Sequence, residues 1–315
     1  MVATLAVIIG LSTLVITVVL MLLGVFDILT LGVLVVAINI VQWLIAPYLV
    51  GALYKVRKLS ESENPQLHQI VSNLSQKCGI SKPQLMLAQI PLPNAFAYGS
   101  PLTGSRVAVT QGLLTTLNSG EVEAVLGHEL GHLRHRDVQV MMAISFLPAL
   151  FTYIGYSLMF SSMGQGNRKQ GGGYGPIIGI AFMAFSWVLN LFTLYLSRLR
   201  EYYADRNSVS VVDNGATKLS TGLAKIVNAT AKTNRPQRQR QQQNASAFKT
   251  LFITDPDTAA ADQVALNNID ASYMVDEILR RRITTGDRLK EALSTHPNIV
   301  KRLRVLQQLG QNPNA

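Results

Sequence analysis

Four long stretches of this chain contain no charged side chain, and they constrain its fold more than any other feature. They cover residues 1–26, 28–54, 138–167 and 170–197. Each is longer than the roughly 20 residues that a helix needs to cross a bilayer. Helices buried in a large soluble core are the alternative, but soluble helices usually keep a charged face. The sequence therefore predicts four transmembrane helices.

Basic residues gather beside these stretches. They follow the second and fourth stretches and precede the third: Lys55, Arg57, Lys58, Arg134, Arg136, Arg198 and Arg200. Fewer charges lie in the two other links, with Asp27 in the first and Arg168 and Lys169 in the second. Because cytoplasmic loops are enriched in Lys and Arg, two hairpins with both ends in the cytoplasm fit best. Much of the net charge of +10 is then a topology signal, and no nucleic-acid partner is expected.

Composition argues against several other classes of protein. Charged residues make up 15% of the chain, whereas an average soluble protein has about a quarter, so an ordinary cytosolic enzyme is disfavoured. Hydrophobic residues make up 48%, which excludes a chain that is disordered throughout. The single cysteine, Cys78, excludes an intramolecular disulfide and a four-cysteine zinc site.

The predicted spans divide the chain into four parts. Residues 1–54 form one pair of transmembrane helices and residues 138–197 form another. Residues 55–137 and 198–315 are polar and are expected in the cytoplasm. The last part contains an insert rich in Gln, Arg and Asn at 232–243, which we interpret as a loop or a disordered segment. RNA binding by this insert has little support, because no aromatic residues are interleaved with its basic ones.

The first polar region has the pattern of a mixed α and β fold. A helix is expected over residues 64–78, which have helical periodicity. Short apolar runs at 84–88 and 106–110 predict strands. Residues 94–99, between prolines and glycine, are a candidate edge strand.

The helix expected after Asn118 contains the motif that carries chemistry. Residues 128–132 read HELGH, an H-E-x-x-H pattern. Residues four apart lie on one face of a helix, so His128 and His132 can bind one metal ion. Glu129 can take a proton from a zinc-activated water as it attacks a carbonyl, and can later protonate the departing amine. Burying these groups on an apolar helix would be costly unless something binds them, so we predict a catalytic metal site.

A catalytic zinc usually has a third protein ligand and one open position. The metzincin extension is absent, because His135 stands where that motif needs glycine and Val138 where it needs histidine. A hairpin of the third and fourth spans returns the chain beside its entry point, near Glu201 and Asp205. Glu201 is a candidate zinc ligand, and Asp205 a candidate partner for the other ring nitrogen of a ligating histidine. Alternatively, both carboxylates pair with neighbouring arginines on a solvated helix.

Three separated motifs make this sequence resemble a known family. HELGH, REYYAD at 200–205 and STHPNIVKRL at 294–303 are similar to motifs of the HtpX group of membrane zinc metalloproteases, relatives of the CAAX prenyl proteases. The resemblance covers nearly the whole chain. It implies a mainly α-helical integral membrane protein, with four transmembrane helices and a zincin-like α+β metalloprotease domain in the cytoplasm. It also implies a gluzincin-type site with one Zn²⁺ per subunit on His128, His132 and Glu201, and Glu129 as the catalytic base.

The resemblance implies roles for residues that the pattern alone leaves open. Asn94, Ala95 and Phe96 resemble the family's edge strand, along which the substrate backbone would align. His296 and Arg302 would reach the active site and stabilise the oxyanion of the tetrahedral intermediate. Without the resemblance, Asn94 is a turn residue, His296 belongs to a helix start and Arg302 is a solvated charge.

The function implied is that of an endopeptidase that cleaves misfolded or damaged membrane proteins during quality control and stress response. The expected location is the cell membrane of a prokaryote, with the active site on the cytoplasmic side. The expected partners are the lipid bilayer and membrane-protein substrates, and the oligomeric state is left open. A processing protease of narrow specificity and a non-proteolytic membrane scaffold that holds zinc are the alternatives. Glu129 argues against the scaffold, because a structural zinc site needs no base.

Overall fold

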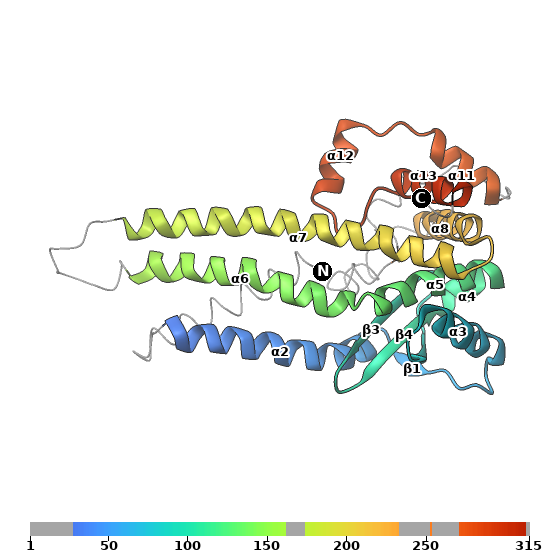
Figure 1. Cartoon of the computed structure of the whole chain (residues 1–315), viewed down its shortest axis with the longest axis horizontal. Coiled ribbons are helices and arrows are strands. Elements are labelled where there is room, and N and C mark those ends of the chain that lie inside the picture. The colour runs from blue at the N-terminus through green and yellow to red at the C-terminus, as the bar shows by residue number, and fades with distance from the viewer. Residues whose placement is uncertain (1–27, 162–173, 233–252, 254–270, 313–315) are drawn as a thin grey trace. The chain divides into compact units, whose positions relative to one another are not determined.

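The computed structural model describes residues 28–161, 174–232, 253 and 271–312 (Figure 1). The first predicted span, 1–26, and almost all of the insert at 232–243 lie outside these residues. The chain divides into two compact units. One contains residues up to 43 and 139–196, and the other contains 44–138 and 197–315. The two predicted polar regions thus belong to one unit.

Three of the described helices, α2 (Ile28–Leu53), α6 (Asp137–Ser161) and α7 (Gly175–Val211), are long and apolar enough to cross a membrane. They coincide with the second, third and fourth predicted spans. Their apolar side chains are largely exposed, as Trp187 on α7 illustrates. Contact with lipid chains would remove this apolar surface from water. α7 continues past the predicted end of its span at 197 as one helix of 37 residues.

Within their unit, α6 and α7 approach closely through small residues. A Cβ atom on Gly179 would lie 2.7 Å from the carbonyl oxygen of Gly155, so any larger residue would push the helices apart. The hydroxyl oxygens of Thr152 and Ser186 are 2.6 Å apart, and Ser186 also donates to the carbonyl of Pro148. Small residues and interhelical hydrogen bonds are typical of helices that pack inside a membrane.

The other unit contains a four-stranded sheet in the order β1-β2-β4-β3. Its strands are β1 (Val56–Lys58), β2 (Gln84–Ala88), β3 (Ala95–Ser100) and β4 (Gly104–Thr110). β2 and β4 are parallel, and the β1–β2 and β3–β4 pairs are antiparallel. The predicted strands at 84–88 and 106–110 are confirmed. Among the described strands β3 pairs only with β4, and so it lies at the edge of the sheet, as predicted for 94–99.

Helices cover this sheet and extend it into a helical layer. They are α3 (Pro65–Cys78), α4 (Gln111–Thr116), α5 (Ser119–Arg134), α8 (Gly215–Lys232), α11 (Ala271–Arg280), α12 (Thr285–Ala292) and α13 (Ile299–Gln311). α5 begins where Asn118 and Glu121 form a reciprocal capping box, which satisfies two backbone N–H groups at the helix start. Its apolar residues join those of α8 and α13 in the main core, which includes Leu126, Leu130, Leu223 and Leu303. Burial of this α5 face holds the HELGH residues at a fixed position between the sheet and the helices.

Candidate metalloprotease site

Two glycines of α5 determine how closely α7 approaches the motif. A Cβ atom on Gly131 would lie 3.0 Å from both the Cα atom of Ala204 and the Cβ atom of Asn207. A Cβ atom on Gly127, one turn earlier, would lie 3.2 Å from Oγ and 3.3 Å from Cα of Ser208. These distances are at the limit of ordinary contact, so the two helices meet at nearly the smallest possible spacing.

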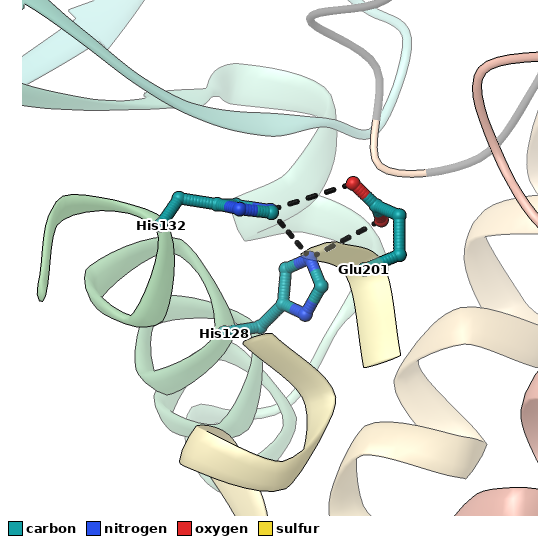
Figure 2. A group of neighbouring side chains, drawn as sticks. All are labelled: His128, His132 and Glu201. Carbon is teal, nitrogen blue, oxygen red and sulfur yellow. Dashed lines mark hydrogen bonds and ion pairs between the residues drawn. The ribbon is translucent and has the colours of Figure 1, made fainter. Parts of the chain in front are cut away.

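The close approach brings together the three predicted metal ligands (Figure 2). The Nε2 atoms of His128 and His132 are 3.2 Å apart. Glu201, from α7, places Oε1 3.5 Å from Nε2 of His132 and Oε2 3.6 Å from Nε2 of His128. The two histidines predicted from helical spacing and the glutamate predicted from the hairpin therefore point towards one position.

The three donors fit a metal ion. Ligands about 2.0–2.1 Å from a tetrahedral zinc are separated from one another by about 3.3–3.4 Å, close to the distances between these three donors. Oε2 of Glu201 is buried and has no hydrogen-bond partner among the described residues, as expected of an atom that binds an ion. Two imidazoles and a carboxylate form a donor set that suits zinc.

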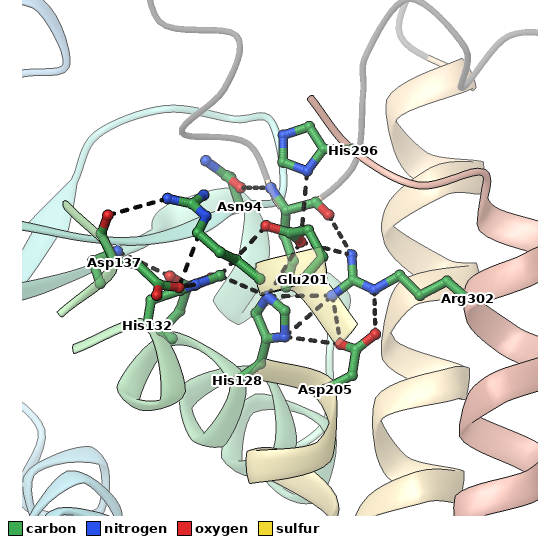
Figure 3. Close-up of polar contacts among 12 residues, drawn as sticks. Asn94, His128, His132, Asp137, Glu201, Asp205, His296 and Arg302 are labelled. Carbon is green, nitrogen blue, oxygen red and sulfur yellow. Dashed lines mark hydrogen bonds and ion pairs between the residues drawn. The ribbon is translucent and has the colours of Figure 1, made fainter. Parts of the chain in front are cut away.

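Each histidine of this cluster also has a carboxylate next to its Nδ1 atom (Figure 3). Nδ1 of His128 lies 2.8 Å from Oδ1 of Asp205, which is the partner that the sequence predicted. Nδ1 of His132 lies 2.6 Å from Oδ2 of Asp137, a residue that the sequence analysis missed. Carboxylates in these positions fix the ring orientation and direct the Nε2 lone pairs towards the metal position.

The turn at Arg136 explains how Asp137 reaches back to His132. Arg136 has a φ of 53°, a left-handed conformation that ends α5 and starts α6 in a new direction. Asp137 is the first residue of α6 and is buried. The only sequence signal was an acidic residue five positions after the second histidine of the motif, and no helical spacing rule singles it out.

Glu129 lies beside the ligands without joining them. Its Oε2 atom accepts a hydrogen bond of 2.9 Å from the backbone N–H of Ala97 on the edge strand β3. Burial of the carboxyl group raises the pKa of Glu129. The contact connects the predicted base directly to the strand along which a peptide could align.

A buried arginine links the carboxylates of the site. Arg302, on α13, donates from Nε and Nη2 to both oxygens of Asp205 at 2.7 Å, and its Nη1 lies 3.4 Å from Oε2 of Glu201. Burial alone would lower the pKa of Arg302, but the carboxylates of Asp205 and Glu201 outweigh it and raise this pKa above its usual value. The guanidinium is therefore charged, and Arg302 is not the solvated residue of the alternative interpretation.

The charges around His128 favour its protonated form. Burial and the Arg302 guanidinium lower the pKa of His128, but the carboxylates of Asp205 and Glu201 outweigh them and raise it to about 9. The metal-free site thus attracts positive charge at the position of the ligands.

A sequence comparison decides the family of this chain. The sequence model of peptidase family M48 matches residues 61–309. The chain belongs to peptidase family M48. The match contains every predicted site residue, from Asn94 just before β3 to Arg302 on α13.

Individual relatives carry the name that the motifs suggested. The "Protease HtpX homolog" of Thermoplasma acidophilum is 41% identical over 274 residues, which cover 86% of this chain and 82% of that protein. The protein of the same name from Aeropyrum pernix is 36% identical over 282 residues, covering 89% and 85%. The resemblance to the HtpX group is confirmed, and this M48 chain is a membrane metalloprotease.

A solved structure shares the fold. The crystal structure of S. mikatae Ste24p matches with a TM-score of 0.54 at 18% sequence identity, covering 96% of this chain and 64% of that one. This M48 chain therefore spans slightly less than two thirds of the length of Ste24p. At this identity the likeness shows the fold alone.

Of the two other histidines considered in the sequence, His296 lies beside Glu201 and His135 lies outside the site. His296 is buried, and its Nδ1 atom lies 3.5 Å from Oε2 of Glu201. Arg198 donates to the carbonyls of Glu291, Ala292 and Ser294, and so holds the segment that leads to His296. His135 is exposed and packs near Tyr203, outside the ligand cluster.

The edge strand contributes through its backbone more than through the predicted side chains. The side chains of Ala95 and Phe96 are buried in two hydrophobic clusters. Asn94 is buried just before β3, with its backbone N–H bonded to Oγ1 of Thr110. The strand's contact with Glu129 comes from the N–H of Ala97, which the sequence analysis did not name. A main-chain donor has no residue signature, so no motif could have found it.

Proposed function

We propose that this M48 protease is a zinc endopeptidase of the gluzincin type, in which His128, His132 and Glu201 hold one Zn²⁺. One observation carries the proposal: Glu129 is buried beside the three ligands, but bonds to the N–H of Ala97 and leaves the ligand positions to the other residues. When bound, zinc supplies Lewis-acid activation of water and of a peptide carbonyl. A structural zinc site would have no use for this fourth ionisable group.

The chain's own residues supply the proton transfer and the charge stabilisation. Glu129 accepts the proton of the attacking water and then donates it to the departing amine. Nη1 of Arg302 lies 3.4 Å and Nδ1 of His296 lies 3.5 Å from Oε2 of Glu201, and these two groups provide N–H donors for the oxygen that gains negative charge. Asp205 and Asp137 keep the two histidine rings in the orientation that metal binding requires.

The edge strand suits a protease that reads the main chain of its substrate. β3 has one unpaired edge in the described sheet, and a peptide added along it would form backbone hydrogen bonds irrespective of its sequence. We propose that Asn94, Ala95 and Phe96 lie along the bound peptide, with Ala97 next to them. Such recognition fits loose sequence preference, as expected for misfolded or damaged membrane proteins.

The sequence places the site next to membrane spans. Asp137 begins α6, and Glu201 belongs to the same helix as the fourth predicted span. Together with the basic residues beside the spans, this supports an active site at the cytoplasmic face of a prokaryotic cell membrane, acting in quality control and stress response. The lipid bilayer and membrane-protein substrates are the proposed partners.

The test compares the detergent-purified chain with Glu129→Gln and with Glu123→Gln. Glu123 lies on the same helix but pairs with Lys218 and does not contact the ligands. We expect the parent and Glu123→Gln to cleave an unfolded test protein, Glu129→Gln to lose at least a hundredfold in rate, and all three to hold about one zinc. Zinc without cleavage in the parent would favour the scaffold or a processing protease with a dedicated substrate.

A further inference from the structure

The helix α12 carries an apolar surface that is largely exposed. Figure 1 shows α12 apart from α11 and α13, its neighbours in the sequence, and none of its residues is buried. Leu289 is 67% exposed, and Leu293, which follows the last turn of the helix, is 58% exposed. Because residues three and four apart are neighbours on one side of a helix, both leucines lie with the exposed Ala292 on one face, the α12 face.

Basic residues stand on both sides of the α12 face. Successive residues of a helix are rotated by about 100°, so Arg288 and Lys290 lie on opposite sides of Leu289. Both basic side chains are exposed. Residues 280–291 contain five basic and two acidic residues, a net charge of +3. An apolar face between lysine and arginine is typical of a helix that lies in the surface of a bilayer and attracts anionic lipids.

The C-terminal end of α12 is attached to α7 just beyond a predicted membrane span. Nη1 of Arg198 donates to three backbone carbonyls at 2.8–3.1 Å, those of Glu291, Ala292 and Ser294. Arg198 is the first residue after the fourth predicted span and belongs to the same helix as that span. α12 is therefore held at the level where α7 would leave the bilayer.

We propose that α12 lies in the headgroup region of the bilayer, with the α12 face turned towards the acyl chains and with Arg288 and Lys290 beside anionic headgroups. The inference rests on the proposed membrane location and not on the peptidase chemistry. It adds a surface attachment that is separate from the predicted spans. This attachment lies close to the site in sequence, because His296 follows Leu293 by three residues and its Nδ1 atom lies 3.5 Å from Oε2 of Glu201.

A second copy of this chain is the other occupant that an exposed apolar face can bind. Two features favour lipid. Stable protein interfaces bury about 1,200 Å² or more, and the three side chains of the α12 face supply only part of that area. The basic flanks of two copies would also repel each other if the two faces met, whereas anionic headgroups would neutralise them.

The experiment measures the depth of α12 in the membrane and does not depend on catalysis. The full chain carrying Glu129→Gln is loaded with zinc and reconstituted into vesicles of phosphatidylcholine with about a third phosphatidylglycerol, an anionic lipid. A nitroxide spin label is attached to a cysteine introduced by Leu289→Cys or by Leu293→Cys. Its collisions with oxygen, which concentrates in the bilayer, are compared with its collisions with a water-soluble nickel chelate.

Two further labelled positions calibrate the measurement. Val188→Cys lies within the fourth predicted span on α7, and Gln308→Cys lies at an exposed position on α13. The native Cys78 is buried, so the chain without an added cysteine should take up no label. We expect the ratio of oxygen to nickel collisions to be about threefold higher, or more, at Leu289 and Leu293 than at Gln308.

The basic flanks should make this depth depend on the charge of the lipid. In vesicles of phosphatidylcholine alone, we expect the ratio at Leu293 to fall by about half, because Arg288 and Lys290 lose their anionic partners. Arg288→Gln combined with Lys290→Gln should cause the same fall in the anionic vesicles. Arg304→Gln removes an exposed charge from α13 and should leave the ratio unchanged. Equal ratios in the two lipids would contradict the contact with anionic headgroups.

Three other results would overturn the proposal. Labels at Leu289 and Leu293 that are as accessible to nickel as the label at Gln308 would place α12 in water. Labels shielded from both reagents in both lipids would show that protein covers the α12 face, and spectral broadening between labels would identify a second copy. A label at Val188 that is accessible to nickel would contradict the proposed membrane location itself, and the inference would fall with it.

Discussion

The Nδ1 atom of His132 lies 2.6 Å from Oδ2 of Asp137, and Nδ1 of His128 lies 2.8 Å from Oδ1 of Asp205. The two histidines proposed as metal ligands come from one helix, whereas their carboxylate partners come from two others, α6 and α7. The orientation of the ligands therefore depends on the turn after α5 as much as on the motif itself. A carboxylate behind a ligating histidine also increases the basicity of the nitrogen that faces the metal.

Replacement of Asp137 with Asn should weaken the metal site without unfolding the chain. The amide keeps the size of the side chain but loses the negative charge that faces His132, and loss of such a partner costs about 10- to 100-fold in metal affinity. Titration of zinc from a metal buffer measures this loss. Asp213→Asn, at an exposed position, is the control and should bind zinc as the parent does.

Replacement of Gly131 with Ala should force α5 and α7 apart. The new methyl group would lie 3.0 Å from atoms of Ala204 and Asn207, and overpacking of this kind costs about 1–3 kcal/mol of stability. Zinc affinity should fall as well, because Glu201 lies on the displaced helix. Gly222→Ala on α8 has room for its methyl group, with its nearest neighbour at 3.6 Å, and should be as stable as the parent or more so. Equal stability of the two variants would contradict the close approach.

Removal of the metal should destabilise the unit that contains the site. Glu129, Glu201, Asp205 and Asp137 are all buried there, and Arg302 is the buried arginine that faces Glu201 and Asp205. Zinc at a thousand times its dissociation constant would stabilise the fold by about 4 kcal/mol. A chelator should therefore lower the melting temperature and added zinc should restore it. A melting temperature unaffected by chelator would show that these carboxylates do not need a cation.

Replacement of Arg302 with Lys should retain the charge and lose the forked contact with Asp205. A lysine cannot donate to both carboxylate oxygens in the geometry of Arg302, and it leaves part of a buried polar network unsatisfied. We expect a loss of about 1–3 kcal/mol in the free energy of unfolding, together with a lower kcat/KM. Arg304→Lys, at an exposed position on the same helix, should change neither quantity.

Much of the site could be predicted because it depends on local spacing. The histidines are four residues apart on a helix with a capping box, and the apolar residues behind them fix which face is buried. Glu201 followed from the hairpin, since antiparallel spans return the chain to its entry point. The edge position of residues 94–99 followed from the short apolar pattern and its flanking turn residues.

Other parts of the site depend on geometry that sequence patterns do not encode. Asp137 reaches His132 only because Arg136 adopts a left-handed conformation that glycine or asparagine would have signalled and arginine does not. The N–H of Ala97 acts through the main chain. Ile253 lies 159 positions after Asn94 and 49 positions before Arg302. No periodicity in the sequence predicts contacts between residues so far apart.

The most direct test of the metal centre compares His132→Ala with His135→Ala. Both histidines stand near the end of α5, but only His132 lies in the ligand cluster, while His135 is exposed. The measurement is zinc per chain by mass spectrometry, with cleavage of an unfolded protein followed in the same samples. The account predicts about one zinc and full cleavage for His135→Ala, and loss of both for His132→Ala. Retention of zinc and cleavage by His132→Ala would contradict it.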